Sequence, residues 1–418
     1  MKSESATPHH ASNSRADSPS DTLRPGTLKI AFYSTYILEY GGGFEKYLVE
    51  TAAKLADMPS VEATVITMDD AFMTKVNDAQ SRIMRQKIDH SINYKESLSD
   101  ITKRLGRARY EKVKSFKELR QKLQNYDVIY SKNELREAFL LKYFVGYKNI
   151  PPVIFGGHTP LQYPRPKALP AKLRNALYKG PAYKHLASGV QKFHAINSYE
   201  SGLYQSLFPG KTVVKVYNPF DIERFKKTAS LHDYSLGSDP KSINIMWVGR
   251  LTEQKGTDDL AEIIRQVNAA LPEDVTVTWN IFGDGDQREL ITQLAREHKN
   301  VRYHGHVDQK KMANIYSKNH VFLSTSKWEG YPYTLIEMQA FGLQGFAYDI
   351  PGPSDIFAEY EGGHIARNLD EMAELLTKHL TKYKTADGVP ASKPSAQFEP
   401  ETIYKQLHAM LRPENQEK

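Results

Sequence analysis

Short apolar runs alternate with longer amphipathic segments along most of this chain. Apolar runs of about four to eight residues bounded by Gly, Pro, Asn or Asp are typical of buried strands, and longer amphipathic segments are typical of helices. A parallel sheet that is covered by helices on both faces produces this alternation. The pattern therefore predicts an α/β protein with doubly wound parallel sheets.

The predicted strands fall into two groups, one in each half of the chain. In the first half they lie near residues 28–33, 62–68, 127–130, 153–155, 192–196 and 213–216. In the second half they lie near residues 243–248, 275–282, 301–304, 321–323 and 345–348. The polar run 224–241 is the predicted linker between the groups, and residues 400–412 are a predicted helix at the carboxyl end.

Length and composition agree with two domains and exclude several kinds of site. The 418 residues are enough for two cores of ordinary size. There is no Cys, which excludes disulfides, thiolate metal sites and cysteine nucleophiles. No apolar run approaches the ~20 residues that span a bilayer, and the amino terminus has no apolar signal core, so we expect a cytoplasmic protein. Residues 1–26 contain few apolar groups and are a predicted disordered tail.

Basic residues gather in two blocks of the first half, in a chain with 56 basic residues, 49 acidic residues and a formal net charge of +7. The first block has two acidic residues, Glu111 and Glu118, and these basic ones: Lys103, Arg104, Arg107, Arg109, Lys112, Lys114, Lys117, Arg120 and Lys122. The second block has no acidic residue and these basic ones: Arg165, Lys167, Lys172, Arg174, Lys179 and Lys184.

The first block also carries apolar residues at short intervals, which predicts an amphipathic basic helix. These residues are Leu105, Tyr110, Val113, Phe116 and Leu119. Such a helix can lie on an anionic membrane surface, where each nearby cation contributes on the order of 1 kcal/mol. The alternative is that the apolar residues pack on the sheet and the cations only face solvent. Nucleic acid is disfavoured, because the chain has no recognisable base-stacking motif.

Two glutamates, Glu329 and Glu337, follow a predicted strand. Gly330 and Pro332 break the backbone between them, and Thr334 can cap a helix that runs through Glu337. Glu329 is then expected in the loop past the strand, and Glu337 in a first helical turn whose free N–H groups attract an anion. This pair suits a sugar nucleotide, with carboxylates for hydroxyls and a helix start for the diphosphate. A surface Glu beside a turn and a Glu favoured by the helix dipole alone would give the same pattern.

A second set of candidates lies about eighty residues upstream. Arg250 and Lys255 flank the loop between a predicted strand and the amphipathic segment 260–271, where two cations can stabilise a leaving diphosphate. Gly283 and Gly285 follow the next predicted strand and allow close backbone approach. Basic residues near turns and glycine pairs in tight turns are also common on ordinary protein surfaces.

Four motifs follow one another in the second half: Gly249-Arg250-Leu251 with Lys255-Gly256, Gly283-Asp284-Gly285, Gly305-His306-Val307, and the stretch from Glu329 to Glu337. Together they resemble the nucleotide-sugar half of retaining glycosyltransferases of family 4, and their order is far more specific than a lone Gly-x-Gly. The first half resembles that family more weakly, through residues 28–33, Gly41-Gly42-Gly43-Phe44-Glu45, Phe155-Gly156-Gly157-His158 and Tyr217-Asn218-Pro219-Phe220-Asp221. Pro332, Pro353 and Asp355 depart from the family pattern, and we assign no role to the loop that holds the last two.

The resemblance implies the GT-B fold, in which two Rossmann-like, doubly wound domains face a central cleft. The expected order is a tail at 1–26, an acceptor-side domain at 27–223, a linker at 224–241, a nucleotide-sugar domain at 242–395 and a helix at 396–418 that packs back across the domains. It also implies retaining transfer of a hexose-type sugar from a UDP- or GDP-linked donor to a lipid-linked or polysaccharide acceptor in cell-envelope glycan synthesis. The expected place is the cytoplasm, including a peripheral position on the inner face of the cell membrane.

The resemblance assigns roles to individual residues. Arg250 and Lys255 would stabilise the leaving diphosphate, Glu329 would hold hydroxyls of the transferred sugar, and Glu337 would hold those of the ribose. His158 is the candidate for a polar contact near the reaction centre, although a lone histidine at a strand end is more often structural. The other donor-binding candidates are Gly43, Gly249, Gly283, His306, Tyr333, Thr334 and Leu335. No residue is assigned as a nucleophile.

Metal and dinucleotide sites fit the sequence less well. Asp284 and Asp286 have a spacing that can hold a divalent ion, but they fall within a glycine turn beside Arg250 and Lys255, so we expect neither a metal nor another cofactor. The Gly-x-Gly-x-x-Gly spacing of dinucleotide sites fails at Lys46, which disfavours an oxidoreductase. The alternative to a transferase is a catalytically silent protein of the same fold that binds sugar nucleotides or glycans.

Overall fold

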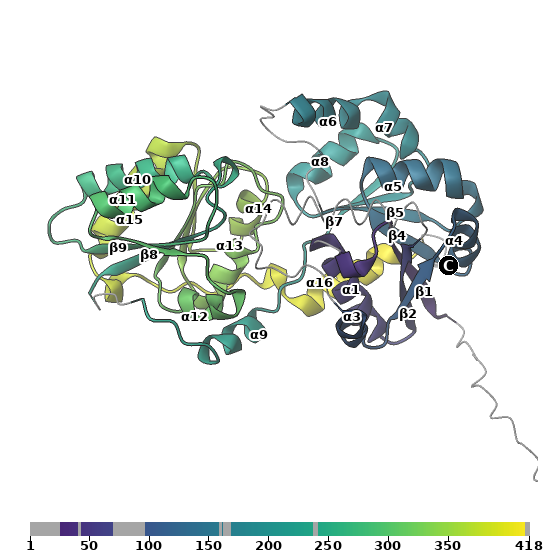
Figure 1. Cartoon of the computed structure of the whole chain (residues 1–418), viewed down its shortest axis with the longest axis horizontal. Helices are drawn as coiled ribbons and strands as arrows, with labels where there is room; N and C mark the ends of the chain where they lie inside the picture. Colours follow the sequence, from purple (N-terminus) through teal and green to yellow (C-terminus); the bar gives the residue numbers. More distant parts are fainter. Residues whose placement is uncertain are drawn as a thin grey trace, which may run out of the picture.

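The computed structural model describes residues 26–40, 43–69, 97–158, 161, 169–236 and 241–413. This part of the chain forms two parallel sheets that lie side by side, each with helices on both faces (Figure 1). The two sheets confirm the predicted α/β architecture. The predicted tail lies outside the described residues except for Gly26.

The first sheet has seven strands in the order β3-β2-β1-β4-β5-β6-β7, and all its neighbours are parallel. Its strands are β1 (Leu28–Ser34), β2 (Val61–Met68), β3 (Arg109–Val113), β4 (Val128–Lys132), β5 (Val153–Gly157), β6 (Lys192–Ala195) and β7 (Thr212–Lys215). Its helical segments are η1 (Leu38–Tyr40), α1 (Gly43–Ala56), α3 (Leu98–Leu105), α4 (Phe116–Leu123), α5 (Leu135–Leu140), the π-helix η2 (Leu141–Val145), η3 (Tyr147–Asn149), α6 (Leu169–Lys179), α7 (Pro181–Leu186) and α8 (Ser198–Leu207).

The second sheet has six parallel strands in the order β10-β9-β8-β11-β12-β13. Its strands are β8 (Ile243–Val248), β9 (Val277–Phe282), β10 (Val301–Gly305), β11 (Val321–Ser324), β12 (Gln344–Tyr348) and β13 (Gly363–Ala366). The helical segments are α9 (Ile222–Lys227), η4 (Thr228–Ser230), η5 (Glu253–Lys255), α10 (Thr257–Ala270), α11 (Arg288–Glu297), η6 (Gln309–Lys311), α12 (Met312–Tyr316), α13 (Thr334–Glu337), η7 (Met338–Phe341), α14 (Pro353–Phe357), α15 (Leu369–Tyr383), η8 (Ala386–Gly388), η9 (Ala396–Phe398) and α16 (Pro400–Leu411).

Each sheet separates two hydrophobic cores, because successive side chains of a strand point to opposite faces. In β1, Ile30 joins the core beneath α1 and α3, whereas Ala31 joins the core beneath α4 to α8. In β8, Ile245 joins the core with α10, α11 and α15, whereas Met246 joins the core with α12 to α14. Because all the strands of a sheet are parallel, the polar groups that follow them gather at one edge of the sheet, its carboxyl edge.

The predicted basic helix between Lys103 and Lys122 is wrong. Gly106, at a φ of 55°, ends α3, and the Ser115 side chain accepts a hydrogen bond from Glu118 N to begin α4. Between these signals lies the edge strand β3. Leu105, Val113 and Leu119 are buried, so the apolar residues pack on the sheet, which was the alternative interpretation of the block.

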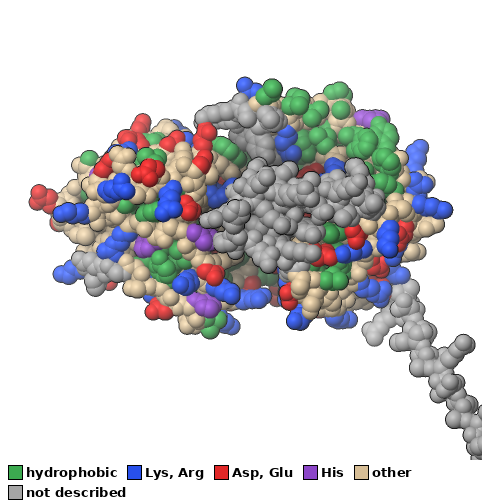
Figure 2. Space-filling model, viewed as in Figure 1, with side chains coloured by type: hydrophobic (Ala, Val, Ile, Leu, Met, Phe, Trp, Pro, Cys, Tyr) green, Lys and Arg blue, Asp and Glu red, His purple; other side chains and the backbone are tan. Residues whose placement is uncertain are grey.

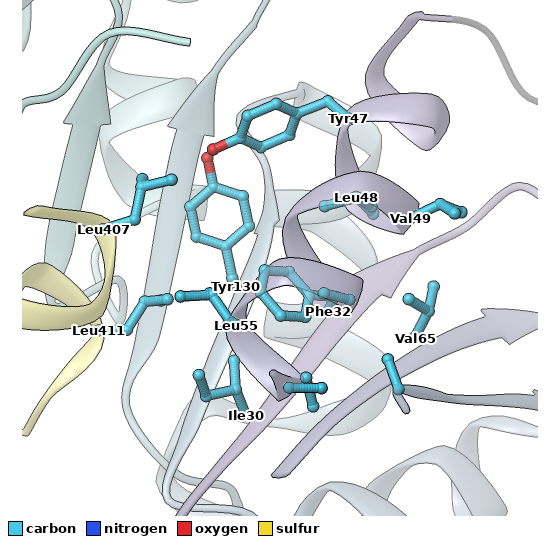
Figure 3. Close-up of a cluster of buried hydrophobic side chains, with 14 of the residues drawn as sticks. Ile30, Phe32, Tyr47, Leu48, Val49, Leu55, Val65, Tyr130, Leu407 and Leu411 are labelled. Atoms are coloured by element: carbon cyan, nitrogen blue, oxygen red, sulfur yellow. The ribbon is translucent and has the colours of Figure 1, made fainter. Parts of the chain in front are cut away.

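The last helix, α16, joins the two halves of the molecule. Phe398 lies in a core of the second sheet, and Leu407 and Leu411 of α16 are buried beside Ile30 and Phe32 of β1 (Figure 3). Full burial of one Leu side chain stabilises a protein by about 1.5–3 kcal/mol, so this segment ties the second half firmly to the first.

The run predicted as a linker, 224–241, begins within α9. Leu236, farther along the run, is buried in the same second-sheet core as Ile222 of α9, so part of the run belongs to that core. Residues 237–240 lie outside the described part.

Candidate functional site

Two loops at the carboxyl edge of the second sheet pack backbone against backbone. Gly283 has a φ of 129°, and a Cβ at this position would lie 1.8 Å from Gly249 O. A Cβ on Gly285 would lie 2.3 Å from Leu251 O. Leu251 N donates to Asp284 O at 3.0 Å. The glycines therefore let the loop after β9 support the loop that carries Arg250.

Lys255 is anchored between the ends of β8 and β11. Its carbonyl accepts a hydrogen bond from Thr325 Oγ1 at 2.8 Å, and Trp247 Nε1 donates to the same hydroxyl at 3.0 Å. Gly256 has a φ of 64°, and a Cβ there would lie 2.0 Å from Thr325 O. Only glycine suits both this conformation and this contact.

The structure brings Lys255 and Glu329 into direct contact. Lys255 Nζ forms an ion pair with Glu329 Oε1, and the two side chains are 22% and 11% exposed. Gln254 lies beside the pair, because it accepts from Arg250 Nη2 at 3.2 Å and donates to Trp328 O at 3.5 Å. Arg250 itself is exposed. One connected set of contacts thus joins two cations and a carboxylate at this edge.

Glu337 lies in the first turn of α13, as predicted, but the expected Thr334 cap is wrong. Thr334 is the first helical residue, and Tyr333 occupies the cap position without a side-chain hydrogen bond. The α-helix is one turn long before η7 continues it, so its dipole offers less to an anion than the sequence implied. Tyr316 Oη donates to Glu337 Oε2 at 2.9 Å, and burial raises the pKa of Glu337.

The other donor-binding candidates differ in what they can offer. The Leu335 side chain is fully buried, which leaves only its backbone for a ligand. Tyr333 is 39% exposed, and His306 is exposed in the loop after β10. Gly43 is the first residue of α1.

His158 lies at the end of β5 in a series of hydrogen bonds. His194 Nε2 is 2.8 Å from Val216 O, which can only accept, so this nitrogen carries hydrogen. Burial lowers the pKa of His194 to about 4, so the ring is neutral and its Nδ1 accepts from Tyr130 Oη at 2.7 Å. Tyr130 Oη in turn accepts from His158 Nε2 at 2.7 Å.

This series fixes the tautomer of His158. Burial and then His194 and Lys132 hold the pKa of His158 well below its usual range, so the ring is neutral. With hydrogen on Nε2, the Nδ1 lone pair of His158 is a hydrogen-bond acceptor. The rings of Tyr47 and Phe44 lie 4.1 and 5.1 Å from the His158 ring, and Figure 3 shows the Tyr47 and Tyr130 hydroxyls pointing toward each other.

The loop of Glu329 and Glu337 lies near α1 of the first half. Burial raises the pKa of Tyr333 in that loop, and the nearby Tyr47 and Glu50 of α1 raise it further. Tyr47, which packs on His158, therefore lies near the second sheet's loop.

Asp355, to which the sequence gave no role, contacts the first half of the chain. Its carboxylate accepts from Ser198 N at 2.9 Å and Ser198 Oγ at 2.5 Å, and it pairs with Lys215 Nζ at 3.2 Å. Beside it, Asn197 Nδ2 donates to Gly330 O at 2.9 Å. These partners are too far apart in sequence for any local pattern to reveal the contact.

A polar cluster at the carboxyl ends of β1 and β4 was also missed. Thr35 Oγ1 donates to the buried Glu137 Oε1 at 2.5 Å, and Arg136 Nη2 lies 3.2 Å from the same oxygen. Lys132 pairs with Glu134 at 2.9 Å. Burial raises the pKa of Glu137. The run of charged residues directly after the strand at 128–132 was the available signal.

The described residues contain neither a cluster of metal ligands nor a helix that could span a membrane. No group of three or more His, Asp or Glu side chains there could hold a metal ion. Asp284 Oδ1 instead accepts from Gly285 N at 2.8 Å within its own turn. No helix in the same part of the chain has both the length and the apolar composition needed to cross a membrane.

Solved structures with the same two-domain arrangement show that the chain has the GT-B fold of glycosyltransferases. HepE of Anabaena, in complex with UDP and glucose, superposes with a TM-score of 0.60 at 17% identity, covering 92% of this chain and 99% of that one. The lipopolysaccharide outer core galactosyltransferase WaaB, in its apo form, superposes with a TM-score of 0.59 at 16% identity, covering 91% and 98%.

Residues 232–389 match the family model of glycosyl transferases group 1. The amylovoran biosynthesis glycosyltransferase AmsD of Erwinia amylovora is 26% identical over 232 residues, which cover 53% of this chain and 62% of AmsD. An uncharacterized 41.2 kDa protein in the cps region of Klebsiella pneumoniae is 26% identical, and the GtfA subunit of UDP-N-acetylglucosamine–peptide N-acetylglucosaminyltransferase of Streptococcus agalactiae is 28% identical. The matches cover 40% and 35% of this chain, and 46% and 29% of those two proteins, so this chain spans less than half of either relative.

Proposed function

We propose that the protein is a retaining glycosyltransferase that moves a hexose-type sugar from a nucleoside-diphosphate sugar to a lipid-linked or polysaccharide acceptor in cell-envelope glycan synthesis. The observation that carries this proposal is the connected set of Arg250, Gln254, Lys255 and Glu329 at one sheet edge. Two cations there suit a diphosphate, and the carboxylate suits sugar hydroxyls. The similarity to the glycosyltransferases AmsD and GtfA and the UDP bound to HepE support the same class of reaction.

In the proposed reaction the bond between the anomeric carbon and the diphosphate oxygen breaks, and the acceptor oxygen bonds to the same carbon. Arg250 and Lys255 stabilise the negative charge that grows on the diphosphate. When the donor binds, the Lys255 ammonium turns partly from Glu329 to a phosphate oxygen. Glu329 then accepts hydrogen bonds from the sugar hydroxyls. The acceptor proton leaves with the nucleoside diphosphate, so retention requires no protein nucleophile.

The remaining donor contacts are proposed from the geometry of the same edge. Glu337 accepts hydrogen bonds from the ribose of a UDP- or GDP-linked donor, and the His306 backbone lies near the base. His158 contacts a hydroxyl near the reaction centre through Nδ1. The two cations supply the charge that a metal would otherwise supply, so the proposed reaction is metal-independent.

We place the enzyme in the cytoplasm, peripheral on the inner face of the cell membrane, where a lipid-linked acceptor is accessible. The two basic blocks of the first half differ as membrane contacts. In the first block Lys112 pairs with Glu39, and Lys122 with Glu111. The second block contains no acidic residue.

The test is donor turnover. The purified chain is incubated with a panel of UDP- and GDP-sugars, and release of nucleoside diphosphate is measured with and without EDTA. The proposal predicts release from at least one donor that is insensitive to EDTA. Donor binding without release, across a panel that includes a lipid-linked acceptor, would instead identify a silent sugar-nucleotide binder.

A further inference from the structure

One flank of the first domain exposes large apolar side chains that an ordinary soluble surface would bury. On α6, Leu169, Leu173 and Leu177 are 78%, 58% and 41% exposed. Their spacing of four residues places them on one side of the helix. Phe139, at the end of α5, is 45% exposed. In η2, Tyr143 is 56% exposed and Phe144 is 45% exposed. These six side chains are called the apolar flank below.

Hydrophobic side chains gather on the part of the surface over α5, α6 and α7 (Figure 2). Phe139 lies 5.1 Å from Tyr143 and 6.0 Å from Phe144, measured between ring centroids. Lys142 Nζ donates to His185 O at 2.7 Å and to Ser188 Oγ at 2.9 Å, which holds η2 against the end of α7. The aromatic part of the flank is therefore clustered and held against α7.

The segment of chain that carries the apolar flank has charges of one sign. Residues 138–199 contain no Asp or Glu at all. The same run contains these basic residues: Lys142, Lys148, Arg165, Lys167, Lys172, Arg174, Lys179, Lys184 and Lys192. Lys172, Lys179 and Lys184, next to the leucines, are exposed. An apolar centre with a cationic rim matches an interface between anionic headgroups and acyl chains.

We propose that the apolar flank docks the protein on an anionic lipid surface, with Leu169, Leu173, Phe139 and Phe144 entering the interfacial layer. Lys172, Lys179 and Lys184 contact the headgroups. The apolar area supplies the hydrophobic part of the binding free energy, and the cations supply the electrostatic part. The exposed cations Lys114, between β3 and α4, and Lys117 of α4 lie beside the apolar flank, because Phe116 packs on Phe144 with ring centroids 4.8 Å apart.

A second copy of the chain is a poorer occupant of the same surface. Most dimers are related by a twofold axis, which places the same patch of each copy against itself. Two acid-free basic faces would then meet without any compensating carboxylate. Anionic lipid complements this charge, whereas a second copy repeats it.

Only the purpose of this docking surface, which is access to a lipid-linked acceptor, depends on the proposed function. Its test is flotation of the full chain with phosphatidylcholine vesicles, with and without phosphatidylglycerol. We expect binding that requires phosphatidylglycerol and weakens with salt. Lys172→Gln with Lys179→Gln should reduce partitioning by about tenfold or more, since each nearby cation contributes on the order of 1 kcal/mol. Leu169→Ser with Leu173→Ser should reduce it at any salt concentration.

Two controls make the result specific. Lys299→Gln with Lys378→Gln removes two exposed cations of the second half, and Leu231→Ser changes a leucine that is 68% exposed beyond α9, so both should bind vesicles as the unaltered protein does. The proposal would be overturned if the unaltered protein did not float with vesicles, or if the flank variants bound vesicles as well as the unaltered protein does. It would also be overturned if the unaltered protein bound no lipid but sedimented as a dimer that the flank variants lose. Release of nucleoside diphosphate from a soluble donor should be equal in all variants, so failure of the docking surface is distinguishable from failure of the proposed reaction.

Discussion

At the residue scale, Tyr130 decides which nitrogen of His158 is available. Its hydroxyl lies between two neutral histidines and gives its hydrogen to His194, whose other nitrogen is committed to Val216 O. The motif Phe155-Gly156-Gly157-His158 places the histidine, but nothing near it in sequence predicts its partners. Gly156 belongs to this arrangement, because a Cβ there would lie 2.0 Å from Tyr130 Oη.

Tyr130→Phe should release this constraint. His158 Nε2 then loses its acceptor, so the Nδ1–H tautomer becomes populated and kcat/KM for sugar transfer falls by about tenfold, as for loss of one buried hydrogen bond. Nitrogen-15 NMR of the histidine rings reads the tautomer directly, beside the rate of nucleoside-diphosphate release. Tyr147→Phe is the control, because it removes a buried tyrosine hydroxyl that has no hydrogen bond and lies in η3, outside this series. An unchanged His158 tautomer in Tyr130→Phe would contradict the account.

Glu200 makes stability depend on pH. It is 3% exposed in the first turn of α8, and burial raises its pKa to about 8. Between pH 5 and 8 the folded state holds a proton that the unfolded state has lost, so the free energy of unfolding falls as pH rises, with a slope approaching about 1.4 kcal/mol per pH unit. Glu200→Gln should lessen this slope and stabilise the protein at pH 8 in urea denaturation. Glu223→Gln, at an exposed position of α9, is the control, and equal slopes in both variants would show that Glu200 is not the titrating group.

At the element scale, the fold was predictable where strands are buried on both faces. The two strands that the pattern missed, β3 and β13, both lie at sheet edges. β3 reads Arg-Tyr-Glu-Lys-Val, because an edge strand with one open side tolerates polar residues. β13 has only four residues. Burial, which generates the apolar run, is incomplete at these positions.

Gly256 tests the packing that supports Lys255. Gly256→Ala should lower the melting temperature strongly, since it combines a φ of 64° with a Cβ placed 2.0 Å from Thr325 O. Gly305→Ala is the matched control, because Gly305 has a φ of 67° and nothing within 4 Å of an added Cβ, so only the strain of about 1–2 kcal/mol applies. Calorimetry of both variants separates the two effects. Equal melting temperatures of the two variants would mean that the loop of Gly256 moves away from Thr325 without any loss of stability.

At the scale of the whole molecule, the second half of the site was predictable and the first half largely was not. Arg250, Lys255, Glu329 and Glu337 lie in short motifs whose spacing carries the signal. The contacts of Asp355 and the cluster around Glu137 join residues that lie far apart in the sequence, and only the assembled fold reveals them.

Asp355 should hold the two halves in their present arrangement. Asp355→Ala removes the contacts to Ser198 and Lys215, so the two halves of the molecule separate more readily, and KM for the donor should rise severalfold with little change in kcat. Small-angle X-ray scattering should show a larger radius of gyration than for the unaltered protein. Asp349→Ala is the control, since Asp349 accepts a hydrogen bond from Ser354 within its own loop. A donor KM and a radius of gyration that both stay constant would exclude this role.

The central claim is that the second sheet's edge binds the paired phosphates of a sugar nucleotide and stabilises the leaving group. Its most direct test is the steady-state release of nucleoside diphosphate by Arg250→Gln and Lys255→Gln, with Lys327→Gln as a control because Lys327 pairs with Asp258 beside the same loop. The account predicts that kcat falls by about 10²-fold or more in the first two variants and changes little in the third. Full turnover by both Arg250→Gln and Lys255→Gln, with every donor that the unaltered protein uses, would contradict it.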